Sequence, residues 1–239
     1  MPVSLEIPIE DVDTARRVAP YVERIEVCDE LASDGWSPSA ETLEAIVRAT
    51  AAHSVQVVAL IRPRSCPDFI VSTEAVRQAR ADIEAASRAG VDGVVVGFLD
   101  RRNHLDFESL QELSELARSL DLSSSLHRVF DFDEDHEGAL QMATQCGLER
   151  VLTSGAPGWE AASSSPEARV DRIRKNVRSS ILHASDSNRP PVRIVACGGV
   201  RASNASLYLE ATSDLHASCR RGNRFDSSSF IGLLKILGR

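Results

Sequence analysis

The sequence predicts a single α/β domain folded as a TIM-like (β/α)8 barrel, and three observations support this fold class. Seven apolar runs end abruptly in polar side chains, and a helix-like stretch follows most of them. These units recur about every 30 residues, which is the length of one βα unit. The 239 residues contain no linker break, and one barrel typically needs about 250 residues. We therefore expect one domain over residues 1–239, with functional side chains at the carboxyl ends of the strands.

An open, doubly wound sheet is the alternative fold for such alternating units. Eight strands separated by helices favour the closed barrel over this sheet and over two domains. The chain also lacks the Gly-x-Gly-x-x-Gly turn that would support a dinucleotide-binding sheet.

The strands are expected from short apolar runs, whose side chains alternate between the helices and the barrel interior. Ile25 and Val27 share one face of the second run, so its polar residues should point inward. In that case Arg24 and Glu26 either line the site or form an ion pair with each other. The expected strands are residues 5–9, 24–28, 55–62, 93–97, 122–127, 150–153, 192–196 and 215–217.

The helices are expected where apolar residues recur at helical spacing between start and stop residues. Asp11 or Asp13 can cap a short first helix that ends at Ala19, and Gly90 stops the helix that begins at Ser72. Three polar segments give no such pattern: residues 156–166, which we expect to be mobile, and residues 185–191 and 220–229. The remaining helices are expected over residues 39–52, 107–120, 134–146, 168–184, 202–211 and 230–237.

Composition excludes several classes of protein. A net charge of −8 argues against a nucleic-acid or anionic-membrane partner. No run approaches the ~18 apolar residues of a membrane span, and the N-terminus does not resemble a signal peptide, so we expect a cytoplasmic protein. Lys175 and Lys235 are the only lysines and neither ends a strand, which argues against Schiff-base chemistry. Five cysteines without a CxxC pair favour a reducing compartment over a disulfide framework.

Four residues at strand ends are candidate catalytic groups. His127 ends the fifth strand and can act as a general acid or base near neutral pH. Asp131 follows it in the loop, within reach of Arg128. Glu26 ends the second strand, and His216 lies on the eighth, which neighbours the first in a closed barrel. For both histidines a structural role is the alternative.

Arginines and glycines at the same end indicate an anion-binding pocket. Arg62 and Arg64 flank a rigid proline, and their guanidinium groups suit carboxylate or phosphate. Their alternative role is a salt bridge to Glu26 or Asp68. Gly198 and Gly199 follow the seventh strand, where backbone N–H groups and a helix N-terminus can hold a phosphate.

A metal site is the other chemical possibility for these strand ends. Cys28, Cys66 and Cys197 all fall at or beyond strand ends on the same side of the barrel, and Cu(I) favours thiolate ligands. Buried, chemically inert cysteines are the alternative. The residues alone therefore leave open a metal site or a metal-independent enzyme for a small anionic compound, such as a phosphorylated one.

In their order along the chain, the strand ends resemble the CutC family, often described as copper homeostasis proteins. The resemblance covers residues ~5–218 and rests on an ordered set of short motifs: Arg24-Ile25-Glu26-Val27-Cys28, Asp34-Gly35-Trp36-Ser37-Pro38-Ser39, Ile61-Arg62-Pro63-Arg64, Asp92-Gly93-Val94-Val95-Val96-Gly97, His127-Arg128-Val129-Phe130-Asp131, Leu152-Thr153-Ser154-Gly155 and His216-Ala217-Ser218. It implies a single-domain, cytoplasmic TIM-like barrel linked to copper tolerance. It also implies that the family's motif positions are Glu26, Cys28, Arg62, Arg64, His127, Arg128, Asp131, Ser154 and His216.

The chain departs from the family pattern at three points. Glu6-Ile7-Pro8 stands where members often carry Glu-Val-Cys, Leu60 replaces a methionine, and Cys197 replaces the first of three glycines. The loss of the cysteine and the methionine weakens the copper interpretation more than the enzyme interpretation, because the arginine, histidine and glutamate set is intact.

Two hypotheses follow. In the first, the protein binds Cu(I) through Cys28 with Cys66 or Cys197. In the second, a metal-independent enzyme holds an anion and exchanges protons through Glu26 and His127, assisted by Asp131 and His216; its anion-binding residues are Arg62, Arg64, Arg128, Ser154, Gly198 and Gly199. No organic cofactor is indicated, and a homo-oligomer is compatible with both.

Overall fold

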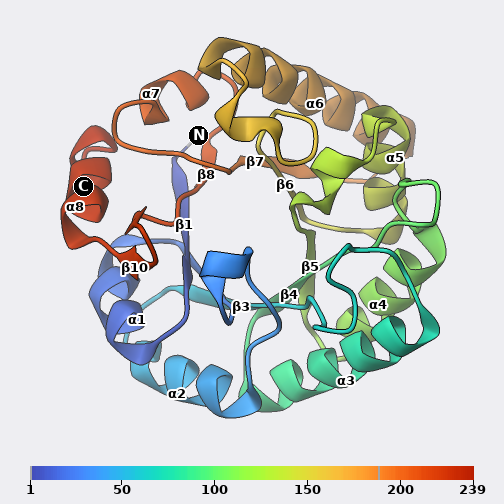
Figure 1. Ribbon diagram of the computed structural model, residues 1–239, viewed down its shortest axis with the longest axis horizontal. Coiled ribbons are helices and arrows are strands. Elements are labelled where there is room, and N and C mark those ends of the chain that lie inside the picture. Colours follow the sequence, from blue (N-terminus) through green and yellow to red (C-terminus); the bar gives the residue numbers. More distant parts are fainter. Residues whose placement is uncertain (1, 188) are drawn as a thin grey trace.

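Eight parallel strands close into one barrel with a ring of helices outside it (Figure 1). The computed structural model describes residues 2–187 and 189–239. The strands follow chain order around the barrel, and the first pairs with the last. The predicted fold class is therefore confirmed. The strands are β1 Ser4–Ile9, β2 Arg24–Val27, β3 Gln56–Leu60, β4 Gly93–Val96, β5 Ser123–Leu126, β6 Arg150–Thr153, β7 Arg193–Ala196 and β8 Asp214–His216.

Side-chain caps begin most of the helices. Ser39, Ser72 and Asp106 each accept a hydrogen bond from the backbone N–H three residues later, which satisfies a donor that the helix leaves free. Apolar residues on the inner face of each helix then pack on the strands in one continuous core. The helices are α1 Val12–Val18, α2 Ala40–Thr50, α3 Thr73–Ala89, α4 Phe107–Ser119, α5 His136–Cys146, α6 Pro166–Ser187, α7 Ala205–Tyr208 and α8 Ser227–Ile236.

The second half of the chain differs most from the sequence-based expectations. Helix α7 has four residues, although residues 202–211 were expected to be helical. Helix α6 begins at Pro166, a residue suited to a first helical position, and extends beyond the expected end at residue 184. Residue 188, within the expected loop 185–191, lies outside the described residues.

Regular structure also occurs where the sequence indicated little. Within residues 220–229, β9 Arg220–Arg221 and β10 Arg224–Phe225 form a hairpin. Asp226 caps α8, which begins three residues earlier than expected. Gly222 supplies the positive φ of the hairpin turn. Four 3-10 turns complete the fold: η1 Ala19–Tyr21, η2 Leu31–Ser33, η3 Arg128–Phe132 and η4 Glu160–Ala162.

The barrel interior contains a layer of buried charges. The parallel register sets Glu6 beside Arg24 on one neighbouring strand and beside His216 on the other. Arg24 consequently pairs with Glu6 at 3.7 Å and with Glu149 at 3.8 Å. The alternative pair of Arg24 with Glu26 is not formed among the described residues, because the register brings Glu6 to Arg24 instead.

Candidate functional site

A cavity of about 540 Å³ opens at the carboxyl ends of the strands. Its charged lining comprises four arginines, two carboxylates and two histidines, supplied by most of the loops at this end. Several sequence-predicted candidates meet here: Glu26, His127, Arg128, Cys197, Gly198, Gly199 and His216. They are joined by residues that sequence reasoning did not single out, among them Asp34, Trp159, Arg169, Arg201 and Arg220.

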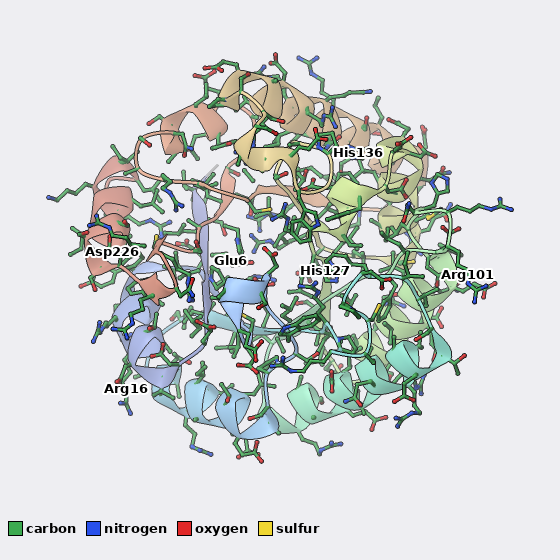
Figure 2. The ribbon with its side chains drawn as sticks, in the orientation of Figure 1. Glu6, Arg16, Arg101, His127, His136 and Asp226 are labelled. Carbon is green, nitrogen blue, oxygen red and sulfur yellow. The ribbon has the colours of Figure 1, made fainter. Side chains whose placement is uncertain are left out.

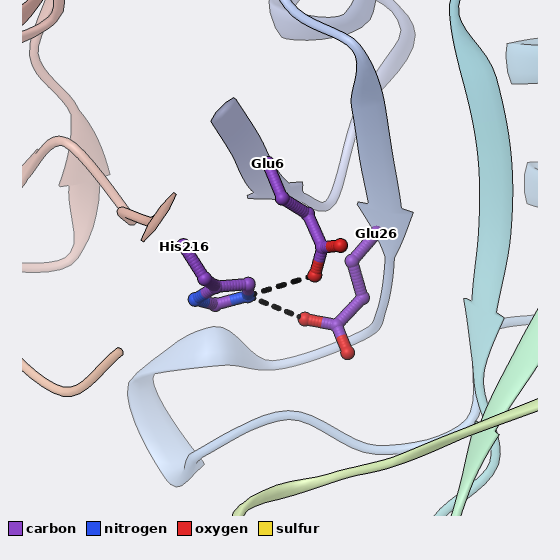
Figure 3. A group of neighbouring side chains, drawn as sticks. All are labelled: Glu6, Glu26 and His216. Atoms are coloured by element: carbon purple, nitrogen blue, oxygen red, sulfur yellow. Dashed lines mark hydrogen bonds and ion pairs between the residues drawn. The ribbon is translucent and has the colours of Figure 1, made fainter. Parts of the chain in front are cut away.

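One wall of the cavity carries a carboxylate–imidazole cluster (Figure 3). His216 Nε2 lies 2.7 Å from Glu26 Oε2 and 3.7 Å from Glu6 Oε1. Burial opposes the charge on His216, but the hydrogen bond and charge of Glu26, together with the charge of Glu6, raise its pKa above the usual value. The structure therefore favours an imidazolium held between two carboxylates.

The charges around this cluster support a protonated His216. Arg150 lies 3.4 Å from Glu6 and 3.2 Å from Asp214, and Arg193 lies 2.5 Å from Asp214. The connected network thus holds four carboxylates and three guanidinium groups: Glu6, Glu26, Glu149 and Asp214 against Arg24, Arg150 and Arg193. Glu149 and Arg193 are more than half exposed and offset each other, so the buried members carry one net negative charge. A proton on His216 neutralises them and removes the cost of a buried net charge.

His127 has the opposite environment. Its Nδ1 accepts a hydrogen bond from the Val129 backbone N–H at 3.1 Å, so the proton of the neutral ring resides on Nε2. Burial, followed by the charge of Arg62, lowers its pKa to about 3; the Gly97 backbone opposes this and Arg128 adds to it. Nε2 is buried and makes no hydrogen bond of normal geometry among the described residues; the Gly97 backbone lies near the ring without closing such a bond. Both His127 and Glu6 lie inside the ring of helices, whereas Arg16 and Arg101 lie at the periphery (Figure 2).

Arg128 and Trp159 form another part of the lining. The Arg128 guanidinium lies 4.8 Å from the centre of the Trp159 ring and donates to the Gly158 carbonyl oxygen at 3.1 Å. Its Nε is 3.9 Å from Asp131. The indole is about half exposed, so this pair is within reach of a ligand entering from solvent.

The Gly198–Gly199 turn is held from below by Arg169. This buried arginine donates to the carbonyl oxygens of Cys197 at 2.9 Å, Gly198 at 2.6 Å and Ser154 at 2.6 Å. Both glycines have positive φ, and a Cβ on Gly198 would lie 2.8 Å from Ser154 Cβ. Their backbone N–H groups donate no hydrogen bond within the described chain. The turn can therefore present free donors to an anion, but α7 begins only at Ala205 and adds no helix N-terminus to the turn.

Arg62 and Arg64 lie outside the cavity lining. Arg62 is buried between the Trp36 and Phe69 rings, 4.3 Å from each, and its terminal nitrogens donate to the carbonyl oxygens of Ser33, Gly35 and Pro67. Arg64 is exposed and pairs with Asp29 and Glu30. The expected alternatives, pairs with Glu26 or Asp68, do not occur among the described residues. The side chains of the two arginines that flank the proline point in different directions. Arg62 holds the loops together through its hydrogen bonds, and Arg64 lies in solvent.

Asp131 and Ser154 are joined to each other below the cavity. Asp131 accepts hydrogen bonds from Thr153 Oγ1 at 2.5 Å and from the Ser154 N–H at 2.9 Å. Burial raises the pKa of Asp131, although these bonds oppose the rise. Neither side chain belongs to the cavity lining. They fix the turn after β6, from which the segment bearing Trp159 departs.

The three candidate copper ligands do not form a common donor set. Cys28, Cys66 and Cys197 belong to three separate apolar clusters. Burial raises the pKa of all three thiols, that of Cys66 to about 11. Cys28 Sγ donates to the Ile9 carbonyl oxygen and Cys66 Sγ to that of Ile70. The raised pKa values favour neutral thiols, two of them hydrogen-bonded to backbone carbonyl oxygens, and the three do not fit a shared Cu(I) thiolate site.

Among the described residues, one group of three or more metal-type ligands has its donor atoms within mutual reach. It is the cluster of Glu6, Glu26 and His216, with donor atoms within 4.8 Å of one another. Its donors are oxygen and nitrogen, which Cu(I) prefers less than thiolate. With His216 protonated, the two carboxylates leave this cluster with one net negative charge, beside the guanidinium groups of Arg24 and Arg150.

The residues that sequence analysis missed had weak signals. Glu6 interrupts an apolar strand, a pattern that marks an inward-facing charge. Arg169 lies within a helix, and Arg201 and Arg220 follow the ends of β7 and β8 by a few residues. Their place after strand ends was the signal that could have found Arg201 and Arg220, but nothing in their spacing distinguishes them from surface arginines. The aromatic Trp159 stood in a segment expected to be mobile.

Comparison with known proteins identifies the family. The family model described as CutC matches residues 3–221. This chain belongs to the CutC family. Family protein CutC of Vibrio campbellii is 33% identical over 222 residues, covering 91% of this chain and 82% of its own. Family protein CutC of Sinorhizobium medicae is 34% identical over 220 residues, covering 91% and 81%.

Solved structures support the fold of this CutC family member. A CutC assigned to copper homeostasis in Streptococcus agalactiae has a TM-score of 0.78 at 22% identity, covering 90% of this chain and 98% of its own. The 3-hexulose-6-phosphate synthase of Salmonella typhimurium has a TM-score of 0.64 at 15% identity, covering 98% of each chain. Within the described residues, no helix has both the length and the apolar character that a bilayer span requires.

Proposed function

We propose that this CutC family member is an enzyme that binds a small anionic compound in the barrel cavity and moves a proton on it. One observation carries the proposal: the Glu26–His216 pair lies in the wall of a cavity that is lined by four arginines and only two carboxylates. In a protein of net charge −8, such a local excess of positive charge favours an anionic ligand.

The anion has two sources of attraction. Arg128 and Arg201 both line the cavity; among the described residues Arg128 has one distant carboxylate, Asp131 at 3.9 Å, and Arg201 has none, whereas Arg220 is paired with Glu10. The free N–H groups of the Gly198–Gly199 turn add neutral donors, and the buried charge of Arg169 lies directly beneath them. A carboxylate or a phosphoryl group suits this combination of donors.

Glu26 and His216 supply the proton-transfer groups. A carboxylate hydrogen-bonded to an imidazolium can accept a proton from the substrate while the imidazolium compensates the change in charge. Because the two groups share a hydrogen bond, they titrate as a pair. Glu6 and Arg150 fix the position of His216 through the buried network.

A two-stage experiment tests this function. A thermal-shift screen of small carboxylates and phosphates identifies stabilising compounds, and proton and phosphorus NMR then follows their conversion. Glu26→Gln should retain the thermal shift and lose at least about 100-fold in conversion rate. Glu44→Gln, an exposed carboxylate on α2, serves as the matched control. The proposal fails if no anion stabilises the protein, or if Glu26→Gln converts substrate at the wild-type rate.

Cu(I) binding in the cytoplasm is the second candidate, favoured by the copper-homeostasis assignment of the Streptococcus agalactiae relative. Cys28 would be the first ligand, and Cys66 or Cys197 would have to move to join it. Titration of the reduced protein with Cu(I) against a competing chelator tests this, with Cys28→Ser alongside. Stoichiometric binding that Cys28→Ser abolishes would support it; no binding beyond the chelator would leave the enzyme.

A further inference from the structure

His127 is a buried polar group that the proton-transfer pair does not require. It lines the same cavity as Glu26 and His216 but extends from the end of β5, whereas they extend from β2 and β8. The cluster in Figure 3 is joined by the contacts of His216 with Glu26 and Glu6 alone. Its role therefore needs an explanation of its own.

The hydrogen bond to Nδ1 determines what His127 can offer. The Val129 N–H is itself a donor, so Nδ1 must be the acceptor and Nε2 must carry the hydrogen. Nε2–H makes no hydrogen bond of normal geometry among the described residues, although the Gly97 backbone lies close enough to oppose the fall in pKa, and leaving a buried donor poorly paired is costly. A ligand oxygen at this wall of the cavity would remove that cost.

The neighbours of His127 prevent it from acting as an acid or base. Burial disfavours an imidazolium most, and the positive charges of Arg62 and Arg128 add to this against the opposing Gly97 backbone, so the pKa falls to about 3. Within the part of the chain that the structure describes, no titratable acid hydrogen-bonds to either ring nitrogen. A neutral imidazole is a stronger hydrogen-bond donor than water in such a site and keeps its proton throughout the reaction.

We propose that His127 is the oxyanion donor of this site, and that the substrate is a small anionic compound bearing a carbonyl group whose oxygen accepts the Nε2–H. This inference rests on the proposed function and names its substrate class. It replaces the sequence-based expectation that His127 exchanges protons.

The chemistry balances with the groups present. Glu26 accepts the proton from the carbon beside the carbonyl, and the C–H electron pair forms a carbon–carbon double bond. The carbonyl π pair moves onto oxygen, and the resulting enolate accepts the hydrogen bond from Nε2–H of His127. The proton on Glu26, or one exchanged with solvent, then returns to carbon. No oxidant, reductant or metal enters the step.

A pair of isosteric variants separates the two nitrogens. In His127→Asn the side-chain oxygen can still accept from the Val129 N–H, since asparagine is a good cap, but no donor reaches the position of Nε2. In His127→Gln the amide N–H reaches that position. The probes are inorganic phosphate, which needs only the arginine and glycine donors, and oxalate, a planar mimic of an enolate that also offers an oxygen to His127.

Calorimetric titration of both probes gives the decisive comparison. We expect His127→Asn to weaken oxalate binding at least about tenfold and phosphate binding less than twofold, and His127→Gln to restore most of the oxalate affinity; a tenfold change is one hydrogen bond of about 1.4 kcal/mol. Nitrogen-15 NMR of histidine-labelled wild-type protein should show the Nε2–H tautomer of His127 unchanged from pH 8 to pH 5.

Three outcomes would overturn the inference. Equal oxalate affinities for the wild type and His127→Asn would mean that Nε2–H turns to the Gly97 carbonyl and is structural. Protonation of His127 between pH 6 and 7 would restore an acid–base role. If neither probe binds the wild type, the anion site itself is absent and the proposed function falls as well; phosphate binding without the oxalate difference overturns the donor role alone.

Discussion

The two histidines of the cavity, His127 on the β5 side and His216 on the β8 side, occupy similar positions at strand ends, but their pKa values are shifted in opposite directions. His216 lies 2.7 Å from one carboxylate and 3.7 Å from another. His127 accepts a backbone N–H and lies near two guanidinium groups. The presence of a histidine at a strand end therefore does not determine its protonation state. The neighbouring charges and burial determine whether the imidazole is a cation or a neutral donor.

This difference divides the cavity into two working sides. The β8 side holds a proton between carboxylates and can exchange it, whereas the β5 side holds a fixed donor for an oxygen. Opposite environments for two titratable groups in one cavity are a recurring means of separating acid–base and electrostatic roles. Four predictions test how firmly the structure maintains the two sides.

Removing Arg150 should have the largest effect, because it holds the β8 side together. Arg150 is 2% exposed and pairs with Glu6 and Asp214. Arg150→Met would leave both carboxylates partly unpaired and should lower the free energy of unfolding by about 3–5 kcal/mol, measured by urea denaturation. Arg193→Met is the control, because Arg193 pairs with the same Asp214 but is 52% exposed. Its cost should be below about 1 kcal/mol, and equal losses would contradict the network described here.

Glu26→Gln should make His216 on the β8 side more like the neutral His127 on the β5 side. The amide keeps the shape of the side chain but removes the charge that raises the pKa of His216. The pKa of His216 should fall, as observed by NMR titration, and the loss of a charged hydrogen bond should cost about 2 kcal/mol at pH 6. Glu44→Gln should change neither quantity. If the pKa of His216 did not change in Glu26→Gln, the group that raises this pKa would have to be Glu6 instead.

The barrel and the position of the site could be predicted because both depend on local patterns. Apolar runs of strand length alternate with capped helices, and each run ends in polar residues, as at Glu26, His127 and His216. The carboxyl ends of parallel strands meet at one end of a barrel, so residues distant in sequence could be placed together without knowing any contact.

The chemical roles could not be predicted because they depend on register and side-chain direction. Arg24 was weighed as a partner of Glu26, yet the strand register pairs it with Glu6. Asp131 follows His127 closely in sequence, but it points beneath the cavity to Thr153. Arg169 has no distinguishing sequence signal, since its role arises from three carbonyl oxygens contributed by separate segments.

The pH dependence of stability should separate the two histidines. The pKa of His127 is depressed in the folded state to about 3, so its contribution to stability is present above the unfolded value of ~6.5 and is lost as the pH falls. The raised pKa of His216 has the opposite sign: its contribution is present below ~6.5 and is lost as the pH rises through the folded pKa.

Urea denaturation from pH 4 to pH 9 measures both effects. His127→Asn should remove up to about 1.4 kcal/mol per pH unit from the acid side of the profile and leave the alkaline side unchanged. His216→Asn should do the reverse. If His127→Asn flattened the alkaline side, the charge states assigned to the two histidines would be exchanged.

Arg64→Gln should have the smallest effect, although the sequence predicted Arg64 to bind the anion. Its guanidinium is exposed, bonded to Asp29 and Glu30, and absent from the cavity lining. Its replacement should therefore leave the phosphate affinity and the melting temperature unchanged. Arg128→Gln is the matched control, since Arg128 lines the cavity; it should weaken phosphate binding about tenfold, as expected for one charged hydrogen bond. Weaker binding in Arg64→Gln would mean that the anion lies above the loop after β3, and the donor roles given to the Gly198–Gly199 turn and to His127 would both have to be reassigned.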